Sequence, residues 1–114
     1  MLRLVEKAPE WKDVLPGVRI EFAPVTNKAW RAARRAAAAV IGKDEIGLTD
    51  EELQEEAGDA FSRALISAGI RAWEGVGDAD GTPVAPSPAL IALFLSDPRR
   101  FEACDNAYVL PIVL

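Results

Sequence analysis

Residues 49–75 read TDEELQEEAGDAFSRALISAGIRAWEG and hold the longest helical pattern in the chain. Thr49 followed three residues later by Glu52 is a capping box. In that motif the threonine side chain accepts a hydrogen bond from the third helical amide, and the glutamate reaches back to the threonine amide. The pattern predicts one helix that runs from Thr49 to about Trp73, with Gly75 closing it.

Apolar residues recur at spacings of three and four along this predicted helix, and they spread over more of its circumference toward its carboxyl end. The second half is therefore expected to be the more buried. Gly58 and Gly69 each cost about 1 kcal/mol relative to alanine, so either can mark a close helix contact. The apolar residues are Leu53, Ala57, Phe61, Ala64, Leu65, Ile66, Ala68, Ile70, Ala72 and Trp73.

Toward the amino terminus, residues 18–23 alternate apolar and charged side chains, the period of a half-buried strand. This strand is expected to pair either with residues 2–6 or with a later glycine-rich turn. Thr26 is expected to cap the alanine-rich helix that follows, with Gly42 at its end. The apolar side of that helix is expected to be Trp30, Ala33, Ala37, Val40 and Ile41.

An aspartate-rich turn is predicted after the long helix. Asp78 and Asp80 precede Gly81, and such residues stabilise turns through their side chains and a left-handed glycine. A calcium loop of the EF-hand type is not favoured. Aligning Gly81 with its invariant glycine would place Val76 and Ser87 at positions that need acidic ligands.

Two short helices are predicted near the carboxyl terminus. Ser87 and Asp97 are capping residues, and each stands directly before a proline, which is favoured at the first helical position. Pro111 is expected to end or kink the second of these helices. The fold class is therefore mostly α with a minor β element (α+β), a small single domain of about four helices with a short strand or hairpin. Its expected parts are an extended amino-terminal segment (1–17), a helical core (18–109) and an apolar tail (110–114).

The composition excludes several function classes. The chain has 114 residues and a formal net charge of −5, whereas nucleic-acid-binding domains are usually basic. It has no histidine, which is the commonest general base and a usual zinc ligand. Its one cysteine, Cys104, allows no intramolecular disulfide and is expected to be a small buried hydrophobic residue. We therefore expect no enzyme activity, no metal and no cofactor.

The expected location is the cytoplasm. No apolar run approaches the roughly 20 residues of a membrane span. The amino terminus also lacks a signal-peptide core before its first charges.

Two charged runs are candidate interaction faces. Complementary helices, within one chain or between subunits, would explain both runs. The alternative is a small helical regulatory or nucleic-acid-binding domain that uses the basic face. The basic run is Lys28, Arg31, Arg34 and Arg35, and the acidic run includes Glu52, Glu55 and Glu56.

Residues 60–84 read AFSRALISAGIRAWEGVGDADGTPV. This stretch resembles the central signature of the small tail assembly chaperones of long-tailed phages and prophages. In that family a helix ends in Trp-Glu-Gly-Val, here residues 73–76, and an aspartate-rich turn with Gly-x-Pro-Val follows, here residues 81–84. A Ser-Pro-capped apolar helix (87–94) and a Phe-Glu-Ala to Tyr-Val segment (101–109) come next in the same order.

The resemblance implies a non-enzymatic role. Proteins of this family are thought to hold the long, helical, aggregation-prone tape-measure protein soluble while tube subunits assemble around it. The implied partner is a tape-measure protein or another tail protein in the bacterial host cytoplasm. Independently of the resemblance, the complementary charged runs also allow a homo-oligomer.

Two segments carry more apolar residues than one helix face needs. Either they fill the core against Phe61, Leu65 and Trp73, or they form a partner groove or a self-association surface. Their partner-binding candidates are Leu90, Ile91, Phe94, Leu110, Ile112 and Leu114, and the charged candidates are Arg31, Arg35, Glu52, Glu55 and Glu56.

Overall fold

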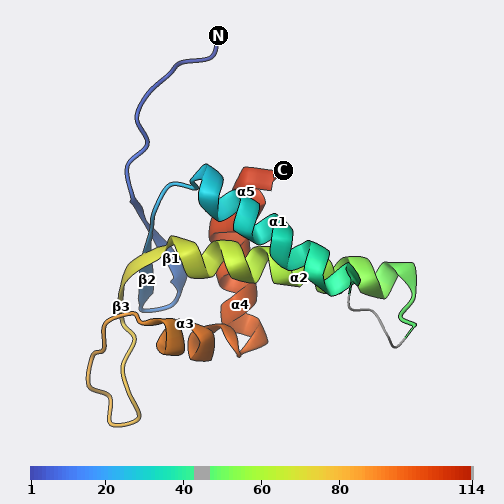
Figure 1. Ribbon diagram of the computed structural model, residues 1–114. Coiled ribbons are helices and arrows are strands. Elements are labelled where there is room, and N and C mark those ends of the chain that lie inside the picture. Colours follow the sequence, from blue (N-terminus) through green and yellow to red (C-terminus); the bar gives the residue numbers. More distant parts are fainter. Residues whose placement is uncertain (43–46, 114) are drawn as a thin grey trace.

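The computed structural model describes residues 1–42 and 47–113, and it confirms a mostly α fold with a small sheet (Figure 1). The strands are β1 (Glu10–Leu15), β2 (Val18–Phe22) and β3 (Ile70–Glu74). The helices are α1 (Asn27–Gly42), α2 (Asp50–Gly69), α3 (Pro88–Leu95), α4 (Pro98–Cys104) and α5 (Leu110–Val113), with a π-helical turn, η1 (Asp105–Val109), between the last two.

The sheet is antiparallel in the order β1-β2-β3, so β2 is its central strand. The strand predicted at residues 18–23 is confirmed at Val18–Phe22, but neither of its two expected partners is correct. The strand pairs with β1 instead of residues 2–6, and on its other side with β3, which ends just before the glycine-rich turn. Pro16 and Gly17 form a tight turn, with Gly17 at a φ of 77°, which folds β1 directly back onto β2. The predicted extended segment 1–17 is therefore extended and outside the sheet only before Glu10.

The long central helix is shorter than the sequence predicts. It ends at Gly69 instead of Trp73, and Ile70–Glu74 form β3. The backbone of these residues pairs with the edge of β2, where Trp73 lies opposite Ile20. Next to this pairing, the Gly69 carbonyl accepts a hydrogen bond from the Ala23 amide at 2.8 Å. Sheet pairing here overrides the local helical preference, because it satisfies the backbone groups and still buries Ile70 and Trp73.

The helix caps follow the prediction. The side chain of Thr26 accepts from the Ala29 amide at 3.1 Å, and that of Thr49 accepts from the Glu52 amide at 3.2 Å. The second bond of the capping box differs from the expectation. The Glu52 carboxylate accepts from the Thr49 hydroxyl at 2.9 Å, where the motif predicts a bond to the Thr49 amide.

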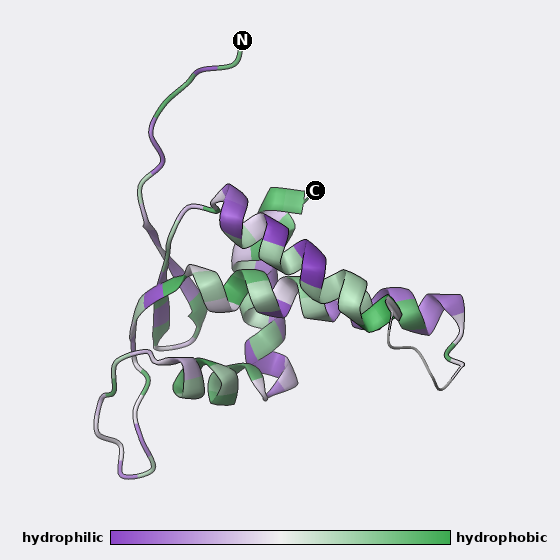
Figure 2. Cartoon of the chain, in the orientation of Figure 1, coloured by the Kyte–Doolittle hydropathy of each residue, from purple (hydrophilic) through white to green (hydrophobic). Residues whose placement is uncertain are grey.

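Helices α1 and α2 pack antiparallel as a two-helix arm that extends beyond the sheet (Figure 1). The rings of Trp30 and Phe61 meet edge to face, with centroids 5.2 Å apart. Of the predicted apolar side of α1, only Ala33 is fully buried, and Ile41 is 47% exposed. Figure 2 shows that hydrophobic residues continue along the arm beyond the sheet.

The core lies between the sheet, the second half of α2, α3 and the carboxyl-terminal helices. Most of the buried residues of α2 lie in its second half, which confirms the prediction that this half is the more buried. Cys104 belongs to it, as expected of a lone cysteine in an apolar pattern. Large side chains that are almost wholly buried include Ile20, Leu65, Ile66, Leu95, Val109 and Cys104.

Of the two outcomes expected at Pro111, an end of the last helix or a kink in it, the first is wrong. The chain continues through η1 into α5, and the Leu110 amide bonds to the Asp105 carbonyl. The π-helical turn changes the hydrogen-bond register just before the proline. Pro111 stands at the second residue of α5, directly after the π-helical turn.

Gly69 packs closely against Tyr108. The Tyr108 ring stacks on Phe22 with centroids 4.4 Å apart, and its hydroxyl donates to the Ala23 carbonyl at 2.6 Å. A Cβ on Gly69 would come within 2.6 Å of this ring, whereas a Cβ on Gly58 would meet nothing within 4 Å. The helix contact that the sequence allowed at either glycine is therefore at Gly69.

The substitution Gly69→Ala is expected to destabilise the protein by about 1–3 kcal/mol, because Tyr108 is held from both sides and cannot move away from the added methyl group. The matched control Gly58→Ala is expected to stabilise it by about 0.5–1 kcal/mol. Urea unfolding followed by tryptophan fluorescence measures both values. Equal effects of the two substitutions would contradict this account of Gly69.

Candidate functional site

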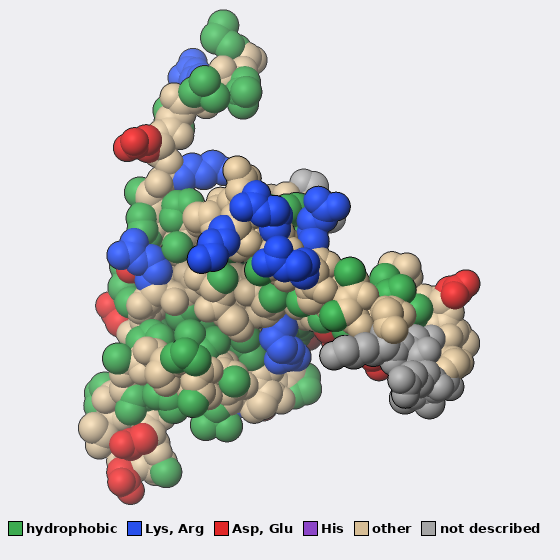
Figure 3. All heavy atoms as spheres, in the orientation of Figure 1, with side chains coloured by type: hydrophobic (Ala, Val, Ile, Leu, Met, Phe, Trp, Pro, Cys, Tyr) green, Lys and Arg blue, Asp and Glu red, His purple; other side chains and the backbone are tan. Residues whose placement is uncertain are grey.

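A shallow apolar groove of about 360 Å³ lies between the β1–β2 turn, the turn at residues 75–84 and α3. Leu93 is the most exposed large apolar side chain along it, at 63%. The apolar side chains over α3 form a continuous patch in the lower part of Figure 3. The lining residues are Leu15, Val18, Gly75, Val76, Gly77, Val84, Leu90, Leu93, Phe94 and Arg100.

One wall of the groove is the aspartate-rich turn, whose prediction is confirmed. One carboxylate oxygen of Asp78 accepts from the amides of Asp80 and Thr82 at 2.9 and 3.0 Å. Gly81 has a φ of +83°, which suits glycine in a tight turn. The Asp78 side chain thus shapes the loop through its own backbone amides.

Trp73 attaches this turn to the rest of the fold. Its indole nitrogen donates to the Val84 carbonyl at 2.6 Å, and its ring lies 5.7 Å from that of Phe94. The Val84 amide also bonds to the Val76 carbonyl at 3.2 Å, which closes the base of the turn. The stretch that carries the family resemblance therefore builds the groove wall and anchors it in the core.

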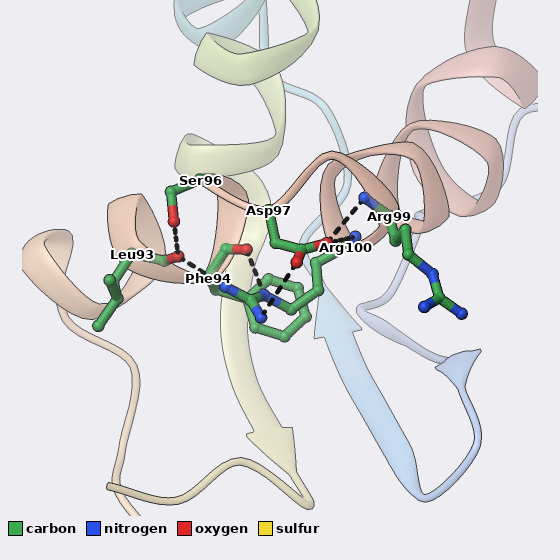
Figure 4. A network of polar contacts seen from close by, with 6 residues as sticks. All are labelled: Leu93, Phe94, Ser96, Asp97, Arg99 and Arg100. Carbon is green, nitrogen blue, oxygen red and sulfur yellow. Dashed lines mark hydrogen bonds and ion pairs between the residues drawn. The ribbon is translucent and has the colours of Figure 1, made fainter. Parts of the chain in front are cut away.

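The other wall is α3, which begins at its predicted cap. Ser87 accepts from the Leu90 amide at 3.2 Å, and Pro88 occupies the first turn. Asp97 caps the next helix in the predicted way, accepting from the amides of Arg99 and Arg100 at 2.8 and 3.3 Å (Figure 4). The two caps fix where the helix that carries Leu93 begins and where its successor starts.

Arg100 holds the carboxyl end of α3. Its guanidinium donates to the carbonyls of Phe94 and Leu93 at 2.7 and 3.1 Å, and it lies over the Phe94 ring at 5.5 Å (Figure 4). The Leu93 carbonyl also accepts from the Ser96 hydroxyl at 2.6 Å. This end of the helix is therefore fixed, and it holds the exposed Leu93 side chain at the groove.

The structure separates the three α3 candidates by burial. Leu90 lines the groove and is half-buried, but Ile91 and Phe94 are each 7% exposed and belong to the core. Ile91 and Phe94 therefore follow the core alternative instead of the partner-surface alternative, although Phe94 also borders the groove. Leu93 is the groove residue that the sequence argument missed. Its signal was present, since Ile91, Phe94 and Leu95 already form one helical face and leave Leu93 off it.

The carboxyl-terminal candidates lie elsewhere. Leu110 is half-buried and Ile112 is 41% exposed, while Leu114 lies outside the described residues. Ile112 borders a separate pocket of about 230 Å³ that Tyr108 and Pro24 also line. The carboxyl end lies across the molecule from α3 (Figure 1), so the fold does not join the two candidate groups into one site.

The charged candidates lie on the arm. Figure 3 shows Lys and Arg side chains gathered over α1, and Arg31, Arg35 and their basic neighbours Lys28 and Arg34 are all exposed. Across the described part of the chain, none of these side chains forms an ion pair with α2. The ion pairs among the described residues join Lys12 to Glu10, Arg19 to Asp13 and Glu74, and Arg100 to Asp97. Glu52, Glu55 and Glu56 are exposed as well.

Cys104 is the nucleophilic side chain of the core. Burial is the main reason that its pKa rises to about 12, and the neighbouring Asp105 carboxylate adds to the effect. The thiol is therefore protonated at neutral pH. Among the described residues no group of three or more acidic, cysteine or histidine side chains is placed to hold a metal ion. None of the helices described combines the length and apolar character needed to cross a membrane.

Comparisons with protein-family models, with curated proteins and with solved structures find no match to this chain.

The Asp97 cap predicts a specific pH dependence. Hydrogen bonds from the Arg100 and Arg99 amides are the main cause that lowers its pKa below 3.8, so the folded state favours the carboxylate. Wild type is therefore expected to be more stable than Asp97→Asn above the unfolded-state pKa. This advantage should shrink as the pH falls through 3.8 and vanish below the folded-state pKa.

Urea unfolding at a series of pH values between about 7 and about 2 measures this difference. The matched control is Asp80→Asn, which removes the same charge from an exposed turn residue. If both variants lose stability with the same pH profile, the cap is not the cause.

Proposed function

We propose that this protein is a non-enzymatic tail assembly chaperone of a phage or prophage, which binds a helical segment of the tape-measure protein and keeps it soluble. One observation carries the proposal. The Trp73–Val84 segment, which resembles the signature of that family, forms the wall of an open apolar groove beside the exposed Leu93.

The groove suits an amphipathic helix. Such a partner presents apolar side chains at spacings of three and four residues, and a shallow groove can take them without enclosing the helix. Val76, Val84 and Leu90 line its floor and sides. A formal charge of −5 opposes aggregation, as a protein that keeps an aggregation-prone client in solution requires.

Gene order supplies the client for a direct test. The proposal expects a neighbouring downstream gene for a very long, helix-rich protein, and its product is co-expressed with this chain. Wild type is expected to raise the soluble fraction of that product and to be co-purified with it. Leu93→Asp is expected to weaken binding by about tenfold or more, because it removes an apolar side chain from the contact.

The matched control is Ala92→Asp, which places the same charge on an exposed position of the same helix but outside the groove lining. Equal loss of binding in both variants would argue against the groove. Absence of any tail gene nearby, or no effect of wild type on the solubility of the client, would argue against the function itself.

A second candidate function is nucleic-acid binding through the basic face of α1, and the exposure of all its cations favours it. It predicts that the anisotropy of a fluorescein-labelled DNA or RNA duplex rises on addition of the protein and that the affinity falls steeply with salt. A titration at low salt that shows no binding removes this candidate.

A further inference from the structure

The two helices of the arm carry opposite charges in matching patterns. Lys28, Arg31 and Arg35 follow one another at steps of three and four residues along α1. Read backward along α2, acidic side chains repeat the same steps at Asp59, Glu56 and Glu52. At 1.5 Å per residue each set spans about 10 Å. We call the first set, with Arg34, the basic face and the second, with Glu55, the acidic face.

The two faces lie on opposite sides of the arm. Ala33 of α1 and Ala57 of α2 are the buried residues of the arm near its two charged sets. By helical periodicity, the members of each face lie roughly 100° to 160° around their own helix from its buried alanine. Each face therefore points away from the partner helix, which is why the two sets of charges do not neutralise one another within the chain.

Neither face forms an ion pair within the described residues, and the Glu52 carboxylate accepts only the neutral Thr49 hydroxyl. The eight side chains are exposed, and the ion pairs of the described chain use other residues. Arg63, the next cation along α2, is already engaged, since it donates to the Leu95 carbonyl at 2.9 Å and lies over the Phe101 ring. The acidic face thus keeps its charge, and the arm has one positive and one negative side.

We propose that the basic face of one copy of this protein docks on the acidic face of a second copy. Because α1 and α2 are antiparallel within the arm, two arms stacked in the same direction also bring α1 of one copy antiparallel to α2 of the next. This arrangement aligns Lys28 with Asp59, Arg31 with Glu56, and Arg35 with Glu52 of the second copy.

The required offset between the two arms is small. Within one chain the Trp30–Phe61 contact sets the level of α1 against α2. The intermolecular alignment differs from it by four residues, which is about 6 Å or roughly one helical turn. The exposed Ala32 lies between the cations of α1, and the exposed Ala38 and Ala39 follow them, so small side chains leave room for a helix to approach.

The contact is heterologous, since it joins two different surfaces. Each copy therefore keeps one free basic and one free acidic face after pairing, and further copies can add in the same direction. Single exposed ion pairs are weak, so the association depends on the whole set and weakens as salt screens it. This inference uses the arm alone and is independent of what the groove binds.

Two double variants test it. Arg31→Glu with Arg35→Glu leaves the basic face without net charge, and Glu52→Lys with Glu56→Lys does the same to the acidic face. Each variant retains one intact face, so neither can pair with itself. An equimolar mixture is expected to form complexes of two copies, one of each variant, because it contains one intact face of each sign.

Sedimentation velocity measures the masses at about 10 mM and about 1 M salt, where the screening length is roughly 30 and 3 Å. Wild type is expected to grow in average mass with concentration at low salt and to be monomeric at high salt. Each double variant alone is expected to associate at least tenfold more weakly than wild type. Circular dichroism verifies that both variants keep their helices.

The matched control is Arg71→Glu with Arg99→Glu, which changes the net charge as much as the basic-face variant but at exposed positions off the arm. It is expected to associate like wild type. A wild type that stays monomeric at low salt, a variant mixture that stays monomeric, or a control that loses association as strongly as the basic-face variant would each overturn the proposal.

Discussion

The contact between Trp73 and the carbonyl of Val84 connects the parts of this fold that would otherwise be separate. Trp73 lies on β3 and pairs with Ile20 of the central strand, its ring meets Phe94 of α3, and its indole nitrogen closes the turn that ends at Val84. A tryptophan can do all three because it combines a large apolar surface with one hydrogen-bond donor. These contacts hold β3, the turn and α3 in one arrangement. The groove depends on this arrangement, because residues of the turn and α3 line it.

The same arrangement explains why the arm is so open. The core is assembled around the sheet and the second half of α2, which leaves α1 with a single fully buried residue, Ala33. The stability of α1 therefore depends on its alanine content, its Thr26 cap and one side of α2. Its outer side is free of packing constraints, so it can carry cations without cost to the core.

Local chemistry predicted the helix beginnings well and the end of α2 poorly. Thr26, Thr49, Ser87 and Asp97 all cap helices, because a capping bond involves residues only two or three apart. The strand Ile70–Glu74 could not be predicted in the same way. Its residues continue the helical pattern of α2, and what makes them a strand is the free edge of β2, about fifty residues earlier in the sequence.

The groove shows the same division between local and long-range causes. Apolar composition indicated that α3 was unusual, but it does not distinguish among the large side chains. Helical periodicity places Ile91, Phe94 and Leu95 on one face, and the structure shows that this face is the one packed into the core. Which side of the helix faces inward depends on the Asp97 cap and on Arg100, which fix the end of α3 against the next helix. Exposure of Leu93 is therefore a consequence of how the α3–α4 corner is built. Leu93 does not contribute to the core, and the α3–α4 corner holds it in place, so its side chain is available for contact with a partner.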